Sequence, residues 1–171
     1  MGKRLFLLRH AKSSWSEGRL AEVDRPLSAR GEKAARMMGR YMAKLKLSPE
    51  LVLCSPSQRT RDTLALIGKA FDEPFDTVIE PSMYLAKPRA LLTLIRAVPD
   101  DIDQLMLVGH DPGLPGVALA LTRGQEGPLA ERLKEKFPTG ALAVLSCESP
   151  NWRGVKAGGC RLDAFVVPRE L

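Results

Sequence analysis

Short apolar runs alternate with longer segments of helical periodicity along the chain, and this alternation is what most narrows its possible folds. An apolar run of about four to eight residues matches a buried strand, whereas apolar residues that recur about every three to four positions indicate a helix. Strands and helices in alternation form an α/β domain with a largely parallel sheet. We therefore predict a three-layer αβα sandwich with a mostly parallel central sheet and an antiparallel edge strand.

The expected elements follow one another without a linker, repeat or low-complexity tract, so the 171 residues are expected to form a single domain, 1–171. The apolar runs predict strands at Arg4–Arg9, Glu50–Cys54, Thr77–Glu80, Gln104–Gly109, Ala141–Cys147 and Arg161–Val167. The periodic segments predict helices at Ser28–Lys46, Ser57–Phe71, Pro88–Ala97, Pro112–Thr122 and Leu129–Phe137. The last two strands are expected to be antiparallel neighbours. The polar, glycine-rich Arg123–Pro128 connects two helices, and whether it closes over a site stays open.

Composition and charge limit the kinds of partner. Hydrophobic residues make up 44% and charged residues 27% of the chain, as in ordinary globular proteins. The 26 basic and 20 acidic side chains leave a net charge of +6, which favours acidic partners such as phosphorylated substrates. The charge is scattered and aromatic residues make up only 5%, so we expect no nucleic-acid binding.

The chain shows no pattern typical of membrane insertion or secretion. Its apolar stretches are much shorter than the roughly 20 residues of a membrane helix. After the basic Met1–Arg4, only Leu5–Leu8 precede the polar Arg9, which is too short for the apolar region of a secretory signal. We therefore expect a cytoplasmic protein without membrane association, while its oligomeric state stays open.

The three cysteines follow neither a disulfide nor a zinc pattern. Cys54, Cys147 and Cys160 are odd in number and lack a C-x-x-C spacing, which argues against a disulfide framework and against a structural zinc site. Cys54 and Cys147 lie in apolar runs, so we expect them to be buried free thiols. Histidines and acidic residues show no clustered ligand spacing either, so we expect neither a metal ion nor a cofactor.

Polar residues that suit an anion follow three of the expected strands. These residues are Arg9, His10, Arg59 and His110. In parallel α/β sheets the ligand crevice lies outside the carboxyl ends of the strands, so these side chains are expected to meet there. A guanidinium fork matches phosphate oxygens, and Arg59 and His110 also lie at expected helix N-termini, which favour anions. Asp111 is the expected N-cap of the helix after His110.

These residues lie in motifs that resemble the histidine phosphatase superfamily, which includes the phosphoglycerate mutases. The motifs occur in the family's order: Leu7–Trp15 (LLRHAKSSW), Asp24–Ser28 with Gly31, Ser55–Pro56 with Arg59 and Thr63, and Val108–Gly113. They fit the short SixA-type branch, and the resemblance covers roughly Leu5 to Leu145.

The resemblance implies a phosphatase that works through a covalent intermediate. His10 would take the phosphoryl group onto a ring nitrogen, and Arg9 and Arg59 would hold the phosphoryl oxygens. His110 would complete the pocket and stabilise the transferring group. Water would then hydrolyse the phosphohistidine.

Residues close to these motifs receive less specific predictions. Lys12 and Ser16 follow His10 in a loop and are expected to contact the phosphate or the leaving group, with plain solvation as the alternative. Trp15 is expected either to cover the pocket or to serve as a packing anchor. Arg25 is expected to form a structural brace with Asp24 or another acid.

The sequence offers no clear general acid for a leaving alkoxide. Glu80, Asp24 and Asp111 are the available carboxylates, and none lies at the position that the resemblance implies; SixA-type members likewise lack this acid. An alkoxide benefits from a proton donor, whereas a phosphoramidate nitrogen can leave already protonated. The expected substrate is therefore phosphohistidine in a phosphorelay or phosphocarrier protein.

Two alternative functions stay open at this point. The chain could hydrolyse or isomerise small phosphate esters, which would require one of these carboxylates to act as the acid. It could also be a module that binds phosphorylated partners through its cationic pocket without turnover.

Overall fold

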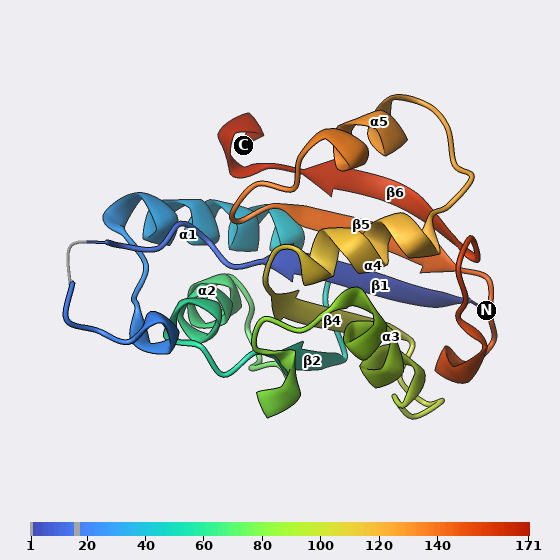
Figure 1. Ribbon diagram of the computed structural model, residues 1–171, viewed down its shortest axis with the longest axis horizontal. Helices are drawn as coiled ribbons and strands as arrows, with labels where there is room; N and C mark the ends of the chain where they lie inside the picture. Colours follow the sequence, from blue (N-terminus) through green and yellow to red (C-terminus); the bar gives the residue numbers. More distant parts are fainter. Residues whose placement is uncertain (1, 16–17) are drawn as a thin grey trace.

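The computed structural model describes residues 2–15 and 18–171 and places a six-stranded sheet between two layers of helices (Figure 1). The order across the sheet is β3-β2-β4-β1-β5-β6, in which the first four strands are parallel and β5 runs antiparallel to both of its neighbours, β1 and β6. The strands are β1 (Lys3–Arg9), β2 (Leu51–Cys54), β3 (Thr77–Ile79), β4 (Gln104–Gly109), β5 (Leu142–Cys147) and β6 (Cys160–Val166). The predicted αβα fold is confirmed, and the edge strand β6 pairs antiparallel with β5.

Helices cover both faces of this sheet. Two of them pack together against one face, and the other three belong to the opposite face (Figure 1). The first pair is α1 (Ala29–Lys44) and α2 (Gln58–Gly68); the others are α3 (Pro88–Arg96), α4 (Gly113–Leu121) and α5 (Pro128–Glu135). Short 3₁₀ turns complete the chain: η1 (Glu22–Asp24), η2 (Pro81–Met83), η3 (Trp152–Gly154) and η4 (Pro168–Glu170). No helix among the described residues has the length and apolarity that a bilayer crossing requires.

The central strands are apolar on both sides because both sides are covered. In β1, Leu5 and Leu7 belong to the core beneath α3, α4 and α5, whereas Phe6 and Leu8 belong to the core beneath α1 and α2. All four side chains are fully buried. A strand of this kind reads as a continuous apolar run, which explains why the alternation in the sequence predicted a parallel sheet.

The parallel strands end at nearly the same level. Arg9 of β1 pairs with Gly109 of β4, and Cys54 of β2 pairs with Val108 of β4. The residues that follow these three strands therefore emerge at one edge of the sheet. This alignment is what brings the polar residues of three distant motifs together.

The loop after β1 is fixed against the start of α1. Ser28 caps α1 by accepting a hydrogen bond from the Gly31 backbone, and the backbone N–H of Ser28 donates to the Lys12 carbonyl at 2.9 Å. A Cβ atom on Gly31 would come within 2.0 Å of the Lys12 carbonyl oxygen. The absence of a side chain at Gly31 thus allows the loop that carries Lys12 to lie against the helix.

We therefore expect Gly31→Ala to destabilise the fold. A backbone atom that cannot rotate away must shift, so the free energy of unfolding should fall by about 2 kcal/mol or more in urea unfolding. Gly68→Ala is the matched control, since Gly68 also lies in a helix but has nothing within 4 Å of its would-be Cβ. That change should be neutral or stabilising by up to about 1 kcal/mol. Equal effects at both positions would contradict the role assigned to the Lys12 contact.

The prediction of free thiols is wrong for Cys147. Cys147 and Cys160 face each other across the antiparallel β5–β6 pair, with Cα atoms 4.1 Å apart, and form a disulfide. The pairing depends on how residues 148–159 return the chain, which the cysteine spacing alone does not indicate. Cys54 is buried and free, as predicted.

Candidate active site

Two imidazole rings meet where β1 and β4 end. His10 follows β1 and His110 follows β4, and their ring centroids lie 5.4 Å apart. Both residues are buried, with 7% and 4% of their surfaces exposed. The structure thus brings together the two histidines that the sequence places after separate strands.

The backbone around His10 fixes both the position of its ring and its tautomer. His10 Nδ1 lies 2.7 Å from the carbonyl oxygen of Ala11. A carbonyl only accepts, so Nδ1 carries the proton and Nε2 keeps a free lone pair. The Ala11 N–H donates to Thr63 Oγ1 at 2.9 Å, and the His10 N–H donates to Gly109 at 3.1 Å. These bonds hold the ring at the end of a rigid strand.

His110 is held by side chains from two other segments. Its Nε2 lies 2.7 Å from Ser55 Oγ, and Arg59 Nη2 lies 3.4 Å from its Nδ1. Because a guanidinium only donates, Nδ1 accepts and Nε2 donates to Ser55. The ring of Tyr84 lies edge-on to His110, with centroids 5.4 Å apart. His110 is therefore fixed as firmly as His10.

Burial and nearby cations keep both histidines uncharged at neutral pH. Burial, together with the charges of Arg59, Arg9 and Arg25, lowers the pKa of His10 from its ordinary 6.5 to about 4, and the hydrogen bond to the Ala11 carbonyl offsets only part of this. Burial, Arg59 and the neighbouring ring lower the pKa of His110 to about 3. A neutral imidazole with a free Nε2 is a nucleophile, whereas an imidazolium is not.

Three guanidinium groups lie near His10 with hydrogen-bond donors to spare. Arg9, Arg25 and Arg59 each have a buried Nε that finds no partner among the described residues. Burial lowers the pKa of Arg9 and the charge of Arg59 lowers it further, while Asp111 opposes them. Buried cations that lie near each other are costly unless an anion compensates them. The arrangement therefore suits a ligand with several anionic oxygens.

Each guanidinium is nevertheless anchored by one or two contacts. Arg9 Nη1 donates to the Phe137 carbonyl and Arg59 Nη1 donates to the Glu22 carbonyl, both at 2.8 Å. Arg25 pairs with the Glu22 carboxylate at 2.6 Å. The predicted brace is thus present, and its acid is Glu22 rather than Asp24. These contacts orient the guanidinium groups and leave other N–H groups of the same side chains available for a ligand.

Comparisons with known proteins identify the family. The histidine phosphatase superfamily (branch 1) matches residues 5–81. An uncharacterized protein of Mycobacterium tuberculosis is 37% identical over 164 residues, which are 95% of this chain and 100% of the relative. A putative phosphohistidine phosphatase SixA from Agrobacterium tumefaciens superposes with a TM-score of 0.81 at 30% identity, covering 98% and 99% of the two chains. The chain belongs to the histidine phosphatase superfamily. A putative SixA from Nakamurella multipartitia gives a TM-score of 0.86 at 27% identity, covering 98% and 97%.

The residues that follow His10 in this histidine phosphatase differ in their surroundings. Lys12 is exposed and lines a groove whose other walls come from α1, α5 and η4 rather than from the histidines. Ser16 lies outside the described residues. Trp15 is 74% exposed and its ring lies 3.5 Å from the guanidinium carbon of Arg25. The alternative in which Trp15 anchors the packing is therefore wrong, and its ring covers Arg25 instead.

Among the described residues, none of the three candidate acids forms a hydrogen bond or ion pair with a histidine side chain. Glu80 accepts hydrogen bonds from Ser82 and caps η2, and Asp24 is exposed. Asp111 is exposed too, and its charge offsets part of the lowering of the Arg9 pKa by burial. The prediction of Asp111 as the N-cap of α4 is wrong: the N-cap is Pro112, no side chain caps the helix, and the His110 carbonyl accepts from Leu114. Within residues 2–15 and 18–171, no three His, Cys, Asp or Glu side chains come together as a metal site.

Several residues of this site were absent from the site predicted from the sequence. Ser55 and Thr63 belong to the motif that resembles the family, but their bonds to His110 and Ala11 were not predicted. Tyr84 follows η2 and has no motif of its own. Its position depends on how the chain turns after β3, which no local pattern indicates.

The depressed pKa values predict how the site titrates. Both imidazoles should remain neutral as the pH falls below 6.5, with midpoints near 4 for His10 and near 3 for His110. Ring ¹³C–¹H shifts can be followed in NMR spectra, and His10→Ala assigns the signals since the chain holds only 2 histidines. A midpoint near 6.5 for either ring would contradict the buried, cation-surrounded geometry.

The same shift links protonation to stability. Between pH 6.5 and about 4, His10 binds fewer protons in the folded protein than in the unfolded chain. The free energy of unfolding should therefore decrease as the pH falls through this window. The decrease should be smaller in His10→Ala, where this group is missing.

Proposed function

We propose that this protein is a phosphohistidine phosphatase that works through a covalent intermediate on His10. The observation that carries the proposal is the free lone pair on His10 Nε2, held beside three guanidinium groups with unused donors. The similarity to the putative phosphohistidine phosphatases SixA from Agrobacterium tumefaciens and Nakamurella multipartitia supports the same activity.

The geometry supports a two-step mechanism. In the first step, His10 Nε2 attacks phosphorus, the N–P bond forms, and the bond to the leaving group breaks with its electron pair. The imidazole becomes positively charged, and the hydrogen bond from Nδ1 to the Ala11 carbonyl stabilises that charge. In the second step, water attacks phosphorus, the bond to Nε2 breaks, and phosphate leaves with the protons of the water shared between product and solvent.

The arginines supply electrostatic stabilisation in both steps. Charge spreads over the three equatorial oxygens of the transferring group, and fixed N–H donors of Arg9 and Arg59 stabilise it. The donors are preorganised because their backbone anchors hold them before the substrate arrives. His110 completes the pocket on the side of Ser55.

The leaving group favours phosphohistidine over an alkyl ester. In the described part of the chain no carboxylate hydrogen-bonds to either imidazole, which argues against a proton donor for an alkoxide fixed beside the nucleophile. A phosphoramidate nitrogen can accept its proton from solvent before the bond breaks. The substrate we propose is therefore a histidine-phosphorylated phosphorelay or phosphocarrier protein.

The test compares two substrates in parallel. Phosphate release is measured from a small protein phosphorylated on histidine with phosphoramidate and from glycerol phosphate, whose alkoxide is a poor leaving group, with His10→Ala as the blank. Release from the phosphohistidyl protein far above the ester, lost in the variant, supports the proposal. Phosphate binding without release from either substrate would instead establish a binding module.

A small-ester phosphatase is the second candidate, and the position of Asp111 is the observation that favours it. The Asp111 carboxylate lies near enough to Arg9 to offset part of the lowering of the Arg9 pKa by burial, and Asp111 directly follows His110, so one acid is close to the pocket. If this acid protonates an alkoxide, Asp111→Asn should slow the ester and spare the phosphohistidyl protein. Equal rates for the ester in both forms would remove this candidate.

A further inference from the structure

A groove of about 450 Å³ opens beside the candidate active site. The loop after β1, helix α1, the end of α5 and the turn η4 line it. Lys12 lies at the end near the histidines, two positions after His10. On the other side, Pro138 and Thr139 line the groove between Phe137, which accepts from Arg9, and Gly140, which donates to the His10 carbonyl. The groove therefore adjoins the site through two backbone segments.

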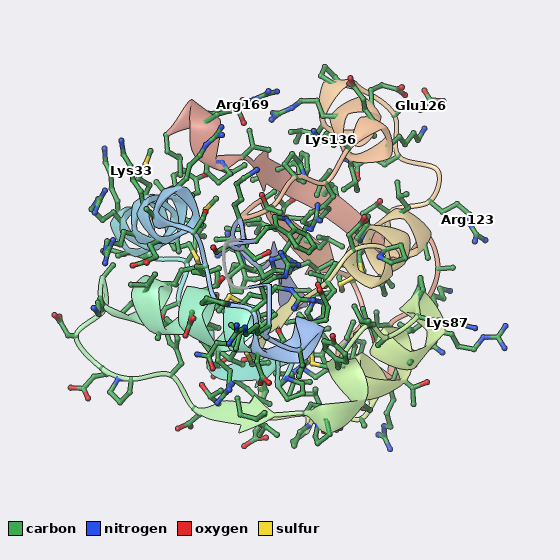
Figure 2. The ribbon with its side chains drawn as sticks, turned by 60° about the vertical axis from the view of Figure 1, so that its left-hand side comes forward. Lys33, Lys87, Arg123, Glu126, Lys136 and Arg169 are labelled. Atoms are coloured by element: carbon green, nitrogen blue, oxygen red, sulfur yellow. A yellow bond between two sulfur atoms is a disulfide. The ribbon has the colours of Figure 1, made fainter. Side chains whose placement is uncertain are left out.

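Basic side chains dominate the wall of this groove. The lining contains one carboxylate, that of Glu135, and six basic residues: Lys12, Arg30, Lys33, Arg132, Lys136 and Arg169. Arg132 forms an ion pair with Glu170 at 2.6 Å, but the other five have no ion pair with any described carboxylate. Figure 2 shows Lys33, Lys136 and Arg169 along one side of the molecule, each on a different segment. This side therefore carries uncompensated positive charge.

Apolar side chains line the same groove between the cations. They come from α1, β6 and the segment that leads into η4: Ala34, Met37, Phe165, Val167 and Pro168. Phe165 and Val167 are 4% exposed, whereas Met37 is half-buried. A surface of this kind can accept an apolar side chain of a ligand while the rim contacts charged groups.

The spread of the cations decides which ligand fits. One phosphate group is compact and engages one or two basic side chains, whereas these cations belong to four separate segments. An extended ligand with several negative charges would reach them all. A nucleic acid would need exposed aromatic faces for its bases, and the one aromatic ring in the lining, Phe165, is buried. Acidic polypeptide matches both the rim and the apolar lining.

We propose that this basic groove docks an acidic segment of the phosphoprotein substrate, with one apolar side chain of that segment against Met37. The proposal rests on the proposed function, because it assigns the protein substrate of the same site. Opposite charges across such a surface accelerate encounter and are screened by salt. Docking should therefore lower KM rather than raise kcat, and the benefit should disappear at high ionic strength.

Binding is tested with an unphosphorylated, fluorescein-labelled peptide of Asp and Glu residues with one central leucine, by fluorescence anisotropy. The groove variant is Lys33→Glu with Arg169→Glu. The matched control is Lys87→Glu with Arg123→Glu, which changes the net charge equally on exposed residues away from the groove (Figure 2). The groove variant should weaken binding by at least about tenfold and the control by much less.

Turnover is tested with two phosphohistidine peptides, one with acidic flanks and one with Gly/Ser flanks. The protein should prefer the acidic peptide through a lower KM, and the groove variant should lose this preference while its turnover of the Gly/Ser peptide stays unchanged. Equal weakening by the control variant, no preference between the peptides, or tighter binding of a single-stranded oligonucleotide of equal charge would overturn the proposal. If neither phosphopeptide is hydrolysed, the proposed function fails, whereas docking is still decided by the anisotropy of the unphosphorylated peptide.

Discussion

His10→Ala is expected to abolish phosphoryl transfer, with kcat falling by roughly 10⁴-fold or more. Alanine leaves no lone pair where His10 Nε2 faces the guanidinium groups, so the first step has no nucleophile. The measurement is phosphate release together with trapping of radiolabelled phosphoenzyme after an acid-free quench. The unsubstituted protein should carry label that is stable to alkali and labile to acid, and the variant should carry none.

Two controls distinguish the loss of the nucleophile from a loss of ligand binding. The variant should still bind orthophosphate or tungstate in calorimetry, since the three arginines are anchored to Phe137, Glu22 and Ser13 rather than to His10. His110→Ala should keep the ability to form labelled enzyme, although more slowly. Label that persists in His10→Ala and vanishes in His110→Ala would reverse the roles of the two histidines.

Arg59→Ala should have the second-largest effect, lowering kcat/KM by about 10²- to 10³-fold. Arg59 donates to the Glu22 carbonyl and to His110, and its charge lowers the pKa of both histidines. Removing it withdraws donors from the phosphoryl oxygens and allows the pKa of His10 to rise above about 4, although burial, the largest cause of the lowered pKa, stays in place. The loss should therefore grow as the pH is lowered from 7 to 5, in a profile of kcat/KM against pH.

Arg61→Ala is the matched control for this change. Arg61 lies on the same helix two positions later, but it is exposed, and within the described residues its side chain donates a hydrogen bond only to Gln58. It should leave both the rate and the pH profile unchanged. Arg59→Lys keeps the positive charge but removes the planar guanidinium group. It should therefore keep the pKa of His10 low, while kcat/KM still falls. A pH profile that shifts equally in Arg59→Lys would show that geometry rather than charge sets the pKa.

Much of the fold could be predicted because the burial of an element determines which residues within that element are apolar. The apolar run of β1 is continuous since both faces of the strand are covered, and this is visible in the sequence without any structure. The gathering of His10 and His110 follows from the same logic, since parallel strands end at one edge. These features depend on neighbours in the chain and on a general rule of sheet topology.

The features that escaped prediction depend on distant segments. The register of the two antiparallel strands β5 and β6 determines whether Cys147 can form a disulfide with Cys160, and the spacing of the cysteines in the sequence does not indicate this register. Arg25 selects Glu22 because η1 turns that carboxylate toward it, although Asp24 is its neighbour in sequence. Tyr84 reaches His110 only because the chain turns after β3. Tertiary geometry, rather than composition or period, fixes these contacts.

The two tryptophans of the chain have opposite surroundings, and this gives the protein an internal pair of optical reporters. Trp152 is fully buried, and its indole N–H donates to the Ile102 carbonyl at 2.7 Å. Trp15 lies in solvent against Arg25, whose charge acts on His10. Iodide or acrylamide will therefore quench the emission of Trp15 selectively, and an anion that draws Arg25 away will change that emission. Occupancy of the site can be followed through Trp15 while Trp152 reports separately on the integrity of the core.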